Sequence, residues 1–160
     1  MKSIGQVKLS NKINEAFKSV RCPNLKELIH RDCSESEDYL SLELLTKNKR
    51  WNDISTELIE DNHDLLSVVS SSGFQFLLPA YMQWAIIDGI SSKSTTLDNL
   101  LYSLNPRSFK GLYIFQKSKY EELSIKQIKV IICFLEYIAK THCEMKEDAE
   151  KALKFWNSQV

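Results

Sequence analysis

A proline lies in the middle of the most apolar run of the chain, which extends from Gly73 to Ile87. After Gly73, only Gln75 and Gln83 interrupt the run. A helix that is apolar on nearly all sides must be buried on nearly all sides. Because proline has no N–H and its ring clashes with the carbonyl four residues earlier, Pro79 predicts a kink. We therefore expect one kinked, buried central helix.

Amphipathic segments on both sides of this run predict further helices. Ser124 and Gln127 form a capping box before the clearest of these segments, and Asn24 and Glu27 form another before a short one. Apolar residues also recur at helical spacing over residues 9–20, 39–45, 54–58, 97–104 and 145–156, whereas residues 109–120 show no clear period. The predicted fold class is all-α, a single compact multi-helix domain over residues 1–160, with the helices 124–141 and 145–156 packed against the central one.

Length and composition restrict the class of protein. The chain has 160 residues, of which 43% are hydrophobic and 26% charged, and its net charge is zero, as is typical of a globular domain. The first residues contain no apolar signal region, and no stretch reaches about 18 consecutive apolar residues. We therefore expect a cytoplasmic protein that does not bind membranes, in which the four cysteines are free thiols.

The residues that carry chemistry form no recognisable active site. Cys22, His30 and Cys33 lie close in sequence and His142-Cys143 could add ligands, but the spacings match no standard zinc pattern. The sequence contains no Gly-x-Ser-x-Gly elbow and no phosphate-binding glycine-rich loop. The mixed charges of residues 1–31 do not favour direct nucleic-acid binding. We predict no catalytic residue, no metal ion and no cofactor.

One acidic segment is the candidate binding site. Residues 32–64 contain ten acidic and three basic residues. If the second half of this stretch is helical, its acidic residues follow the spacing i, i+4, i+7, i+8 and i+11 and form one stripe. Like charges at that spacing repel by a few tenths of a kcal/mol per pair. Two interpretations stay open: a stripe retained for a partner, and an ordinary solvated face. The predicted partner-binding residues are Asp53, Glu57, Glu60, Asp61 and Asp64.

Three groups of motifs, in this order, resemble a bacterial domain family of unknown function. The first is residues 13–17, and the second combines Trp51 with the Gly73-Phe74 to Leu78-Pro79-Ala80-Tyr81 core. The third runs from Leu123-Ser124 through residues 134–137 to the final helix with Asp148-Ala149, Ala152-Leu153 and Trp156. The resemblance covers nearly the whole chain. It implies a single helical domain, and it implies no activity and no catalytic residue.

These observations favour a non-enzymatic protein that binds another protein. Its most concrete form is a bacterial immunity protein that binds and neutralises a cognate toxin domain; a basic nuclease domain is one such partner, which it would bind through charge complementarity. One alternative is an enzyme or small-ligand-binding protein with a pocket between helices, in which His30, His63 or His142 would converge with a cysteine or carboxylate. Another is an adaptor that self-associates through an apolar surface near residues 109–115.

Overall fold

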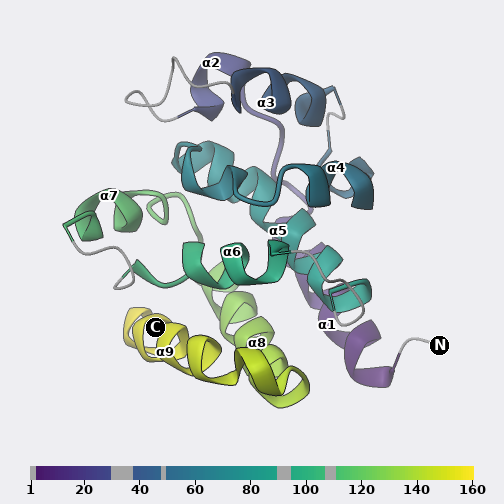
Figure 1. Cartoon of the computed structure of the whole chain (residues 1–160), viewed down its shortest axis with the longest axis vertical. Coiled ribbons are helices and arrows are strands. Elements are labelled where there is room, and N and C mark those ends of the chain that lie inside the picture. Colours follow the sequence, from purple (N-terminus) through teal and green to yellow (C-terminus); the bar gives the residue numbers. More distant parts are fainter. Residues whose placement is uncertain (1–2, 30–37, 48–49, 90–94, 107–110) are drawn as a thin grey trace.

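The computed structural model describes residues 3–29, 38–47, 50–89, 95–106 and 111–160. Over these residues the chain forms nine α-helices and short 3-10 turns but no β-strand, and one isolated bridge pairs Ile29 with Val69 (Figure 1). The all-α prediction is therefore confirmed. The helices are α1 (Ile4–Phe17), α2 (Leu25–Leu28), α3 (Asp38–Thr46), α4 (Thr56–Asp61), α5 (Ser71–Ile87), α6 (Thr96–Ser103), α7 (Tyr113–Ser118), α8 (Ile125–Thr141) and α9 (Lys146–Trp156); the 3-10 turns are η2 (Trp51–Asp53), η3 (Leu65–Ser67), η5 (Cys143–Met145) and η6 (Asn157–Gln159).

Helix α5 is the buried centre that the apolar run predicts. The Ser70 hydroxyl caps it by accepting a hydrogen bond from the N–H of Gly73 at 3.1 Å. Pro79 lies inside this one helix, and the ribbon bends along its length (Figure 1). Most of its side chains are buried, as expected for a helix that is apolar on nearly all sides. Within the described residues no helix, α5 included, is both long and apolar enough to span a bilayer.

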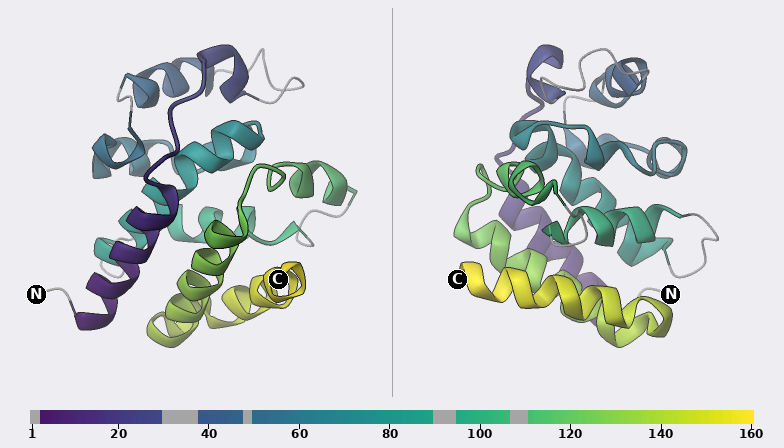
Figure 2. Two further views of the ribbon diagram at one scale, coloured as in Figure 1. Left: turned by 180° about the vertical axis from the view of Figure 1, so that it is seen from behind. Right: turned by 60° about the vertical axis from the view of Figure 1, so that its left-hand side comes forward.

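The packing around α5 differs from the prediction in one respect. Helices α8 and α9 pack most closely against each other, whereas α1 packs against both α5 and α8 (Figure 2). Ile13 and Phe17 of α1 are fully buried at this position, and the Gln127 side chain of α8 donates to the carbonyl of Ala16 at 3.2 Å. Helix α8 also reaches the central helix directly, since the Gln75 amide donates to the side-chain oxygen of Gln127 at 3.0 Å, but its closer neighbours are α1 and α9.

Several helix boundaries are set by side-chain caps. The sequence predicts some of these caps correctly and others not. The capping box of Ser124 and Gln127 is present, and residues 39–45 are helical as predicted. Helix α1 begins earlier than predicted, because Ser3 and Gln6 form a second capping box. Asn24 makes no side-chain cap, so the box predicted with Glu27 is wrong, and α7 was not predicted at all. An acidic connector is predicted at residues 32–38 and a polar loop at residues 91–96; residues 32–37 and 91–94 lie outside the described residues, whereas Asp38 and Thr96 begin α3 and α6.

Gly73 allows the close approach of α2 to the beginning of α5. A Cβ atom at this position would lie 2.5 Å from the carbonyl oxygen of Leu28 and 2.9 Å from Cβ of Val69. The Leu28 oxygen cannot move freely, because it accepts the N–H of Ser70 at 2.8 Å. We expect Gly73→Ala to lower the free energy of unfolding by about 1–2 kcal/mol, because overpacking outweighs the gain in helix propensity.

Urea denaturation measures this effect, and Gly5→Ala is the matched control. A Cβ on Gly5 would meet only the Ser3 hydroxyl oxygen, at 3.7 Å, so that alanine should be neutral or slightly stabilising. Equal stabilities of the two variants would contradict the close contact between α2 and α5.

Candidate protein-binding surface

The predicted acidic site is built on α4, a helix of six residues. The Ser55 hydroxyl caps its first turn by accepting the N–H of Leu58 at 3.3 Å. At the other end Asn62 leaves the helical conformation, with its backbone N–H bonded to Ile59 and its side-chain amide donating to the carbonyl of Leu58 at 2.7 Å. Capping at both ends therefore confines the helix to residues between Ser55 and Asn62.

One face of α5 holds this short helix in place. The Tyr81 hydroxyl donates to the carbonyl of Asn62, and the Trp84 indole N–H donates to the Glu60 carboxylate at 3.1 Å. One turn later, Asp88 accepts a hydrogen bond from the Thr56 hydroxyl at 3.2 Å. These three side chains follow the spacing i, i+3 and i+7, which places them on one side of α5. Both ends and the middle of α4 are therefore fastened to the central helix.

The acidic residues do not form the continuous helical stripe that their spacing predicted. Only Glu57, Glu60 and Asp61 belong to α4. Asp53 lies in η2 before the Ser55 cap, and Asp64 lies beyond Asn62, before η3. The stripe is wrong because it needs a helix from residue 53 to 64, whereas caps end the helix on both sides.

The same residues nevertheless differ in how far they are available to a partner. Glu57, Asp61 and Asp64 are exposed. Glu60 is half-buried, with its carboxylate turned toward Trp84. Asp53 is exposed but lies 3.8 Å from the Arg50 guanidinium, so its charge is partly balanced. The surface that remains for a partner consists of Glu57, Asp61 and Asp64, which we call the α4 acidic surface.

The stretch of chain that contains the α4 acidic surface carries negatively charged side chains and no lysine or arginine. Residues 51–89 contain six acidic residues and no Lys or Arg: Asp53, Glu57, Glu60, Asp61, Asp64 and Asp88. The backbone N–H of Glu57, followed by the Ser55 hydroxyl, lowers the pKa of the Glu57 carboxyl, so this group is charged at neutral pH. Burial, followed by the negative charge of Asp64, raises the pKa of Tyr81, which keeps its hydroxyl protonated as a donor to Asn62.

A cleft beside the α4 acidic surface was not apparent from the sequence. It has a volume of about 310 Å³ and lies between α1, η2, α4 and α5. Asn14, Asn52, Gln83 and Asp88 give it a polar lining. Asp88 lies seven residues after Tyr81, the helical spacing that places it on the face of α5 toward α4.

The histidines and cysteines of the described residues do not converge on a reactive centre. His63 Nδ1 lies 2.8 Å from the side-chain nitrogen of Asn99, whereas His142 Nδ1 lies 2.8 Å from the hydroxyl of Thr141, at the end of α8. Burial lowers the pKa of His142. Cys22, Cys133 and Cys143 are free thiols, and no group of three metal-ligating side chains occurs among the residues described. His30 and Cys33 lie outside those residues.

The fold and this surface define an all-α protein in which α5 presents a short acidic helix. Residues 5–160 match the model of a family of unknown function, DUF6714, and the chain therefore belongs to that family. This agrees with the resemblance to a helical family of unknown function. No curated protein and no solved structure matched the chain.

Proposed function

We propose that this chain is a non-enzymatic binding protein, most concretely a cytoplasmic bacterial immunity protein that neutralises a cognate toxin domain. The observation that supports this most is the α4 acidic surface: three exposed carboxylates on a segment that α5 fastens at three points. A preorganised charged surface binds a complementary partner without first having to order itself. A basic toxin domain, such as a nuclease, is complementary in charge to this surface. The complementarity speeds association of the two proteins, and the bound chain then covers the basic surface of the toxin.

The protein encoded immediately upstream of this gene is the test partner. Co-expression with this chain should abolish its toxicity, and the two proteins should co-purify as a complex whose affinity falls as salt concentration rises. A neighbouring metabolic gene, or a toxic neighbour that this chain neither binds nor neutralises, would overturn the proposal.

Charge reversal locates the surface. We expect the triple variant Glu57→Lys, Asp61→Lys and Asp64→Lys to bind the toxin domain about tenfold to a hundredfold more weakly, chiefly through slower association. All three side chains are exposed, so the fold should tolerate the change. Stopped-flow association kinetics and calorimetric titration measure the two quantities.

The control variant makes the same change in net charge elsewhere on the molecule. Glu136→Lys, Glu144→Lys and Glu150→Lys reverse three exposed acidic residues on α8, η5 and α9, far from α4 in the fold (Figure 1). This variant should retain nearly all of its affinity. Equal losses in the two triple variants would mean that net charge, and not the α4 acidic surface, determines binding.

A further inference from the structure

The N-cap and first turn of helix α7 carry three consecutive exposed apolar side chains, one of which is the most exposed large hydrophobic residue of the described chain. Ile114 is 83% exposed, and Leu112 and Tyr113 beside it are 53% and 39% exposed. Single exposed apolar residues are common on protein surfaces, but here three follow one another, the first at the N-cap and the other two in the first turn. The helix lies at the edge of the molecule, on the side away from α4 (Figures 1 and 2).

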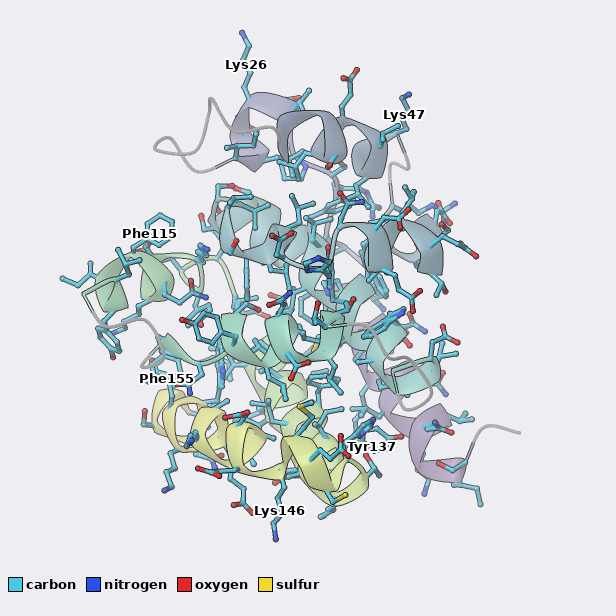
Figure 3. All side chains as sticks on the ribbon, viewed as in Figure 1. Lys26, Lys47, Phe115, Tyr137, Lys146 and Phe155 are labelled. Atoms are coloured by element: carbon cyan, nitrogen blue, oxygen red, sulfur yellow. The ribbon has the colours of Figure 1, made fainter. Side chains whose placement is uncertain are left out.

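The patch borders an apolar groove. The groove has a volume of about 460 Å³ and lies between α7 on one side and α8, α9 and η6 on the other. Its floor is aromatic: the rings of Tyr120, Phe155 and Trp156 pack against one another with centroids 4.7 to 5.7 Å apart. Figure 3 labels Phe155 on α9 beneath α7, which carries Phe115. Ile114 and the groove are therefore a protrusion and a recess on one face.

Among the described residues, α7 is held mainly by its second half. Among the α-helices described, α7 alone does not pack closely along another element. Its attachment comes from side chains at its end: the amide of Gln116 donates to the carbonyl of Ser103 at 2.5 Å, and Lys119 Nζ donates to the carbonyl of Leu66 at 3.1 Å. The first turn, with Tyr113 and Ile114, extends beyond these contacts.

The rim of the groove carries one charge of each sign. Lys117 and Glu121 both line the groove, both are exposed, and neither forms a salt bridge in the part of the chain that the structure describes. In a two-fold symmetric contact, residue i of one copy meets residue j of the other, and the reverse. A rim with one lysine and one glutamate is therefore complementary to itself. A nucleic acid or an anionic membrane would instead favour a rim of basic residues.

We propose that a second copy of this chain covers the α7 groove, forming a two-fold symmetric dimer. Ile114 of each copy enters the groove of the other above Phe155 and Trp156, and Lys117 of each copy pairs with Glu121 of its partner. The proposal is independent of the toxin-binding function, because α4 and α7 lie on different sides of the molecule (Figure 1).

Sedimentation equilibrium over a wide range of concentrations tests the dimer. The molar mass should rise from 18.6 kDa toward about twice that value as concentration increases. Ile114→Glu should raise the dissociation constant about a hundredfold, because two isoleucines leave the interface in each dimer. The control is Ile4→Glu, which replaces another exposed isoleucine, 77% exposed, on α1. It should not alter the dissociation constant of the dimer. Circular dichroism should show equal helix content in all three proteins.

Charge exchange tests the two-fold arrangement. Lys117→Glu and Glu121→Lys should each weaken the dimer about tenfold, because like charges then face each other twice, and the double variant should restore it. Restoration cannot arise from misfolding of the single variants. A wild-type protein that stays monomeric would overturn the proposal, as would a dimer that is insensitive to Ile114→Glu or equally sensitive to Ile4→Glu. Single charge variants that the double variant fails to rescue would also overturn it.

Discussion

Replacing Trp156 by alanine is expected to lower the free energy of unfolding by about 3–5 kcal/mol, the usual range for a fully buried tryptophan. Trp156 is 1% exposed, and its ring lies 4.7 Å from that of Tyr120 and 5.3 Å from that of Phe155, measured between centroids. Its indole N–H donates to the carbonyl of Leu104 at 2.8 Å. This one side chain therefore joins α9 to the end of α6, and its removal leaves both a cavity and an unpaired carbonyl.

Two further variants separate those contributions. Trp156→Phe keeps much of the packing but removes the N–H donor, and we expect it to lose roughly half as much stability as the alanine variant. Trp84→Phe is a matched control at another buried indole, whose donor bonds a half-buried carboxylate instead of a buried carbonyl. Urea denaturation at fixed pH gives all three values. A loss below about 1 kcal/mol for Trp156→Ala would contradict the packing of Trp156 in the aromatic cluster with Tyr120 and Phe155.

The sequence predicts an element correctly where the residues that determine its structure all lie within one segment. The apolar run around Pro79 has no polar side, so its burial follows from its own residues. The capping box at Ser124 and the buried side of α8 likewise depend on residues within a few positions of one another. The Trp156 face of the last helix belongs to the same group.

The parts that were missed depend on residues distant in sequence. The position of α1 between α5 and α8 results from contacts between segments more than 50 residues apart, which periodicity does not specify. Helix α7 shows no amphipathic pattern because Leu112, Tyr113 and Ile114 are exposed while Gln116 and Lys119 are buried, the reverse of the usual preference. That inversion is the observation from which the dimer is proposed.

The candidate binding site was predictable as a group of residues but not as a shape. Charge counting identified the acidic segment, and the structure divides it at Ser55 and Asn62, two cap residues within the supposed stripe. The sequence did not indicate the face of α5 that holds α4 by hydrogen bonds. Tyr81 and Trp84 are apolar enough to be assigned simply to the core. Their hydroxyl and indole N–H groups carry the information that a hydrophobic pattern ignores.

Lys119 is the other side chain on which a large effect is expected. It is 1% exposed although it is a lysine, and its Nζ donates to the carbonyls of Leu66 and Ser67 while lying 4.7 Å from the ring centroid of Phe115. Buried lysines are rare unless their donors are satisfied. These contacts join the segment after α7 to η3, so the ammonium group fixes the position of α7 over its groove.

Lys119→Met should therefore lower the free energy of unfolding by about 3 kcal/mol. Methionine fills a similar volume, but it leaves the carbonyls of Leu66 and Ser67 without the charged donor, and each unsatisfied buried carbonyl costs about 1–3 kcal/mol. Lys129→Met, at an exposed lysine of α8, is the control and should change stability by less than about 0.5 kcal/mol. Denaturation should be measured at low protein concentration, so that any dimer is dissociated.

The same variant connects the stability of α7 to the groove. If Lys119 positions α7, hydrogen exchange of the α7 amides should accelerate in Lys119→Met more than exchange in the middle of α8, because local opening becomes easier than global unfolding. The dimer should weaken in parallel, since Ile114, Lys117 and Glu121 are carried by that segment. Unchanged exchange in α7 together with a loss of global stability would show that Lys119 supports the core near η3 and not the orientation of α7.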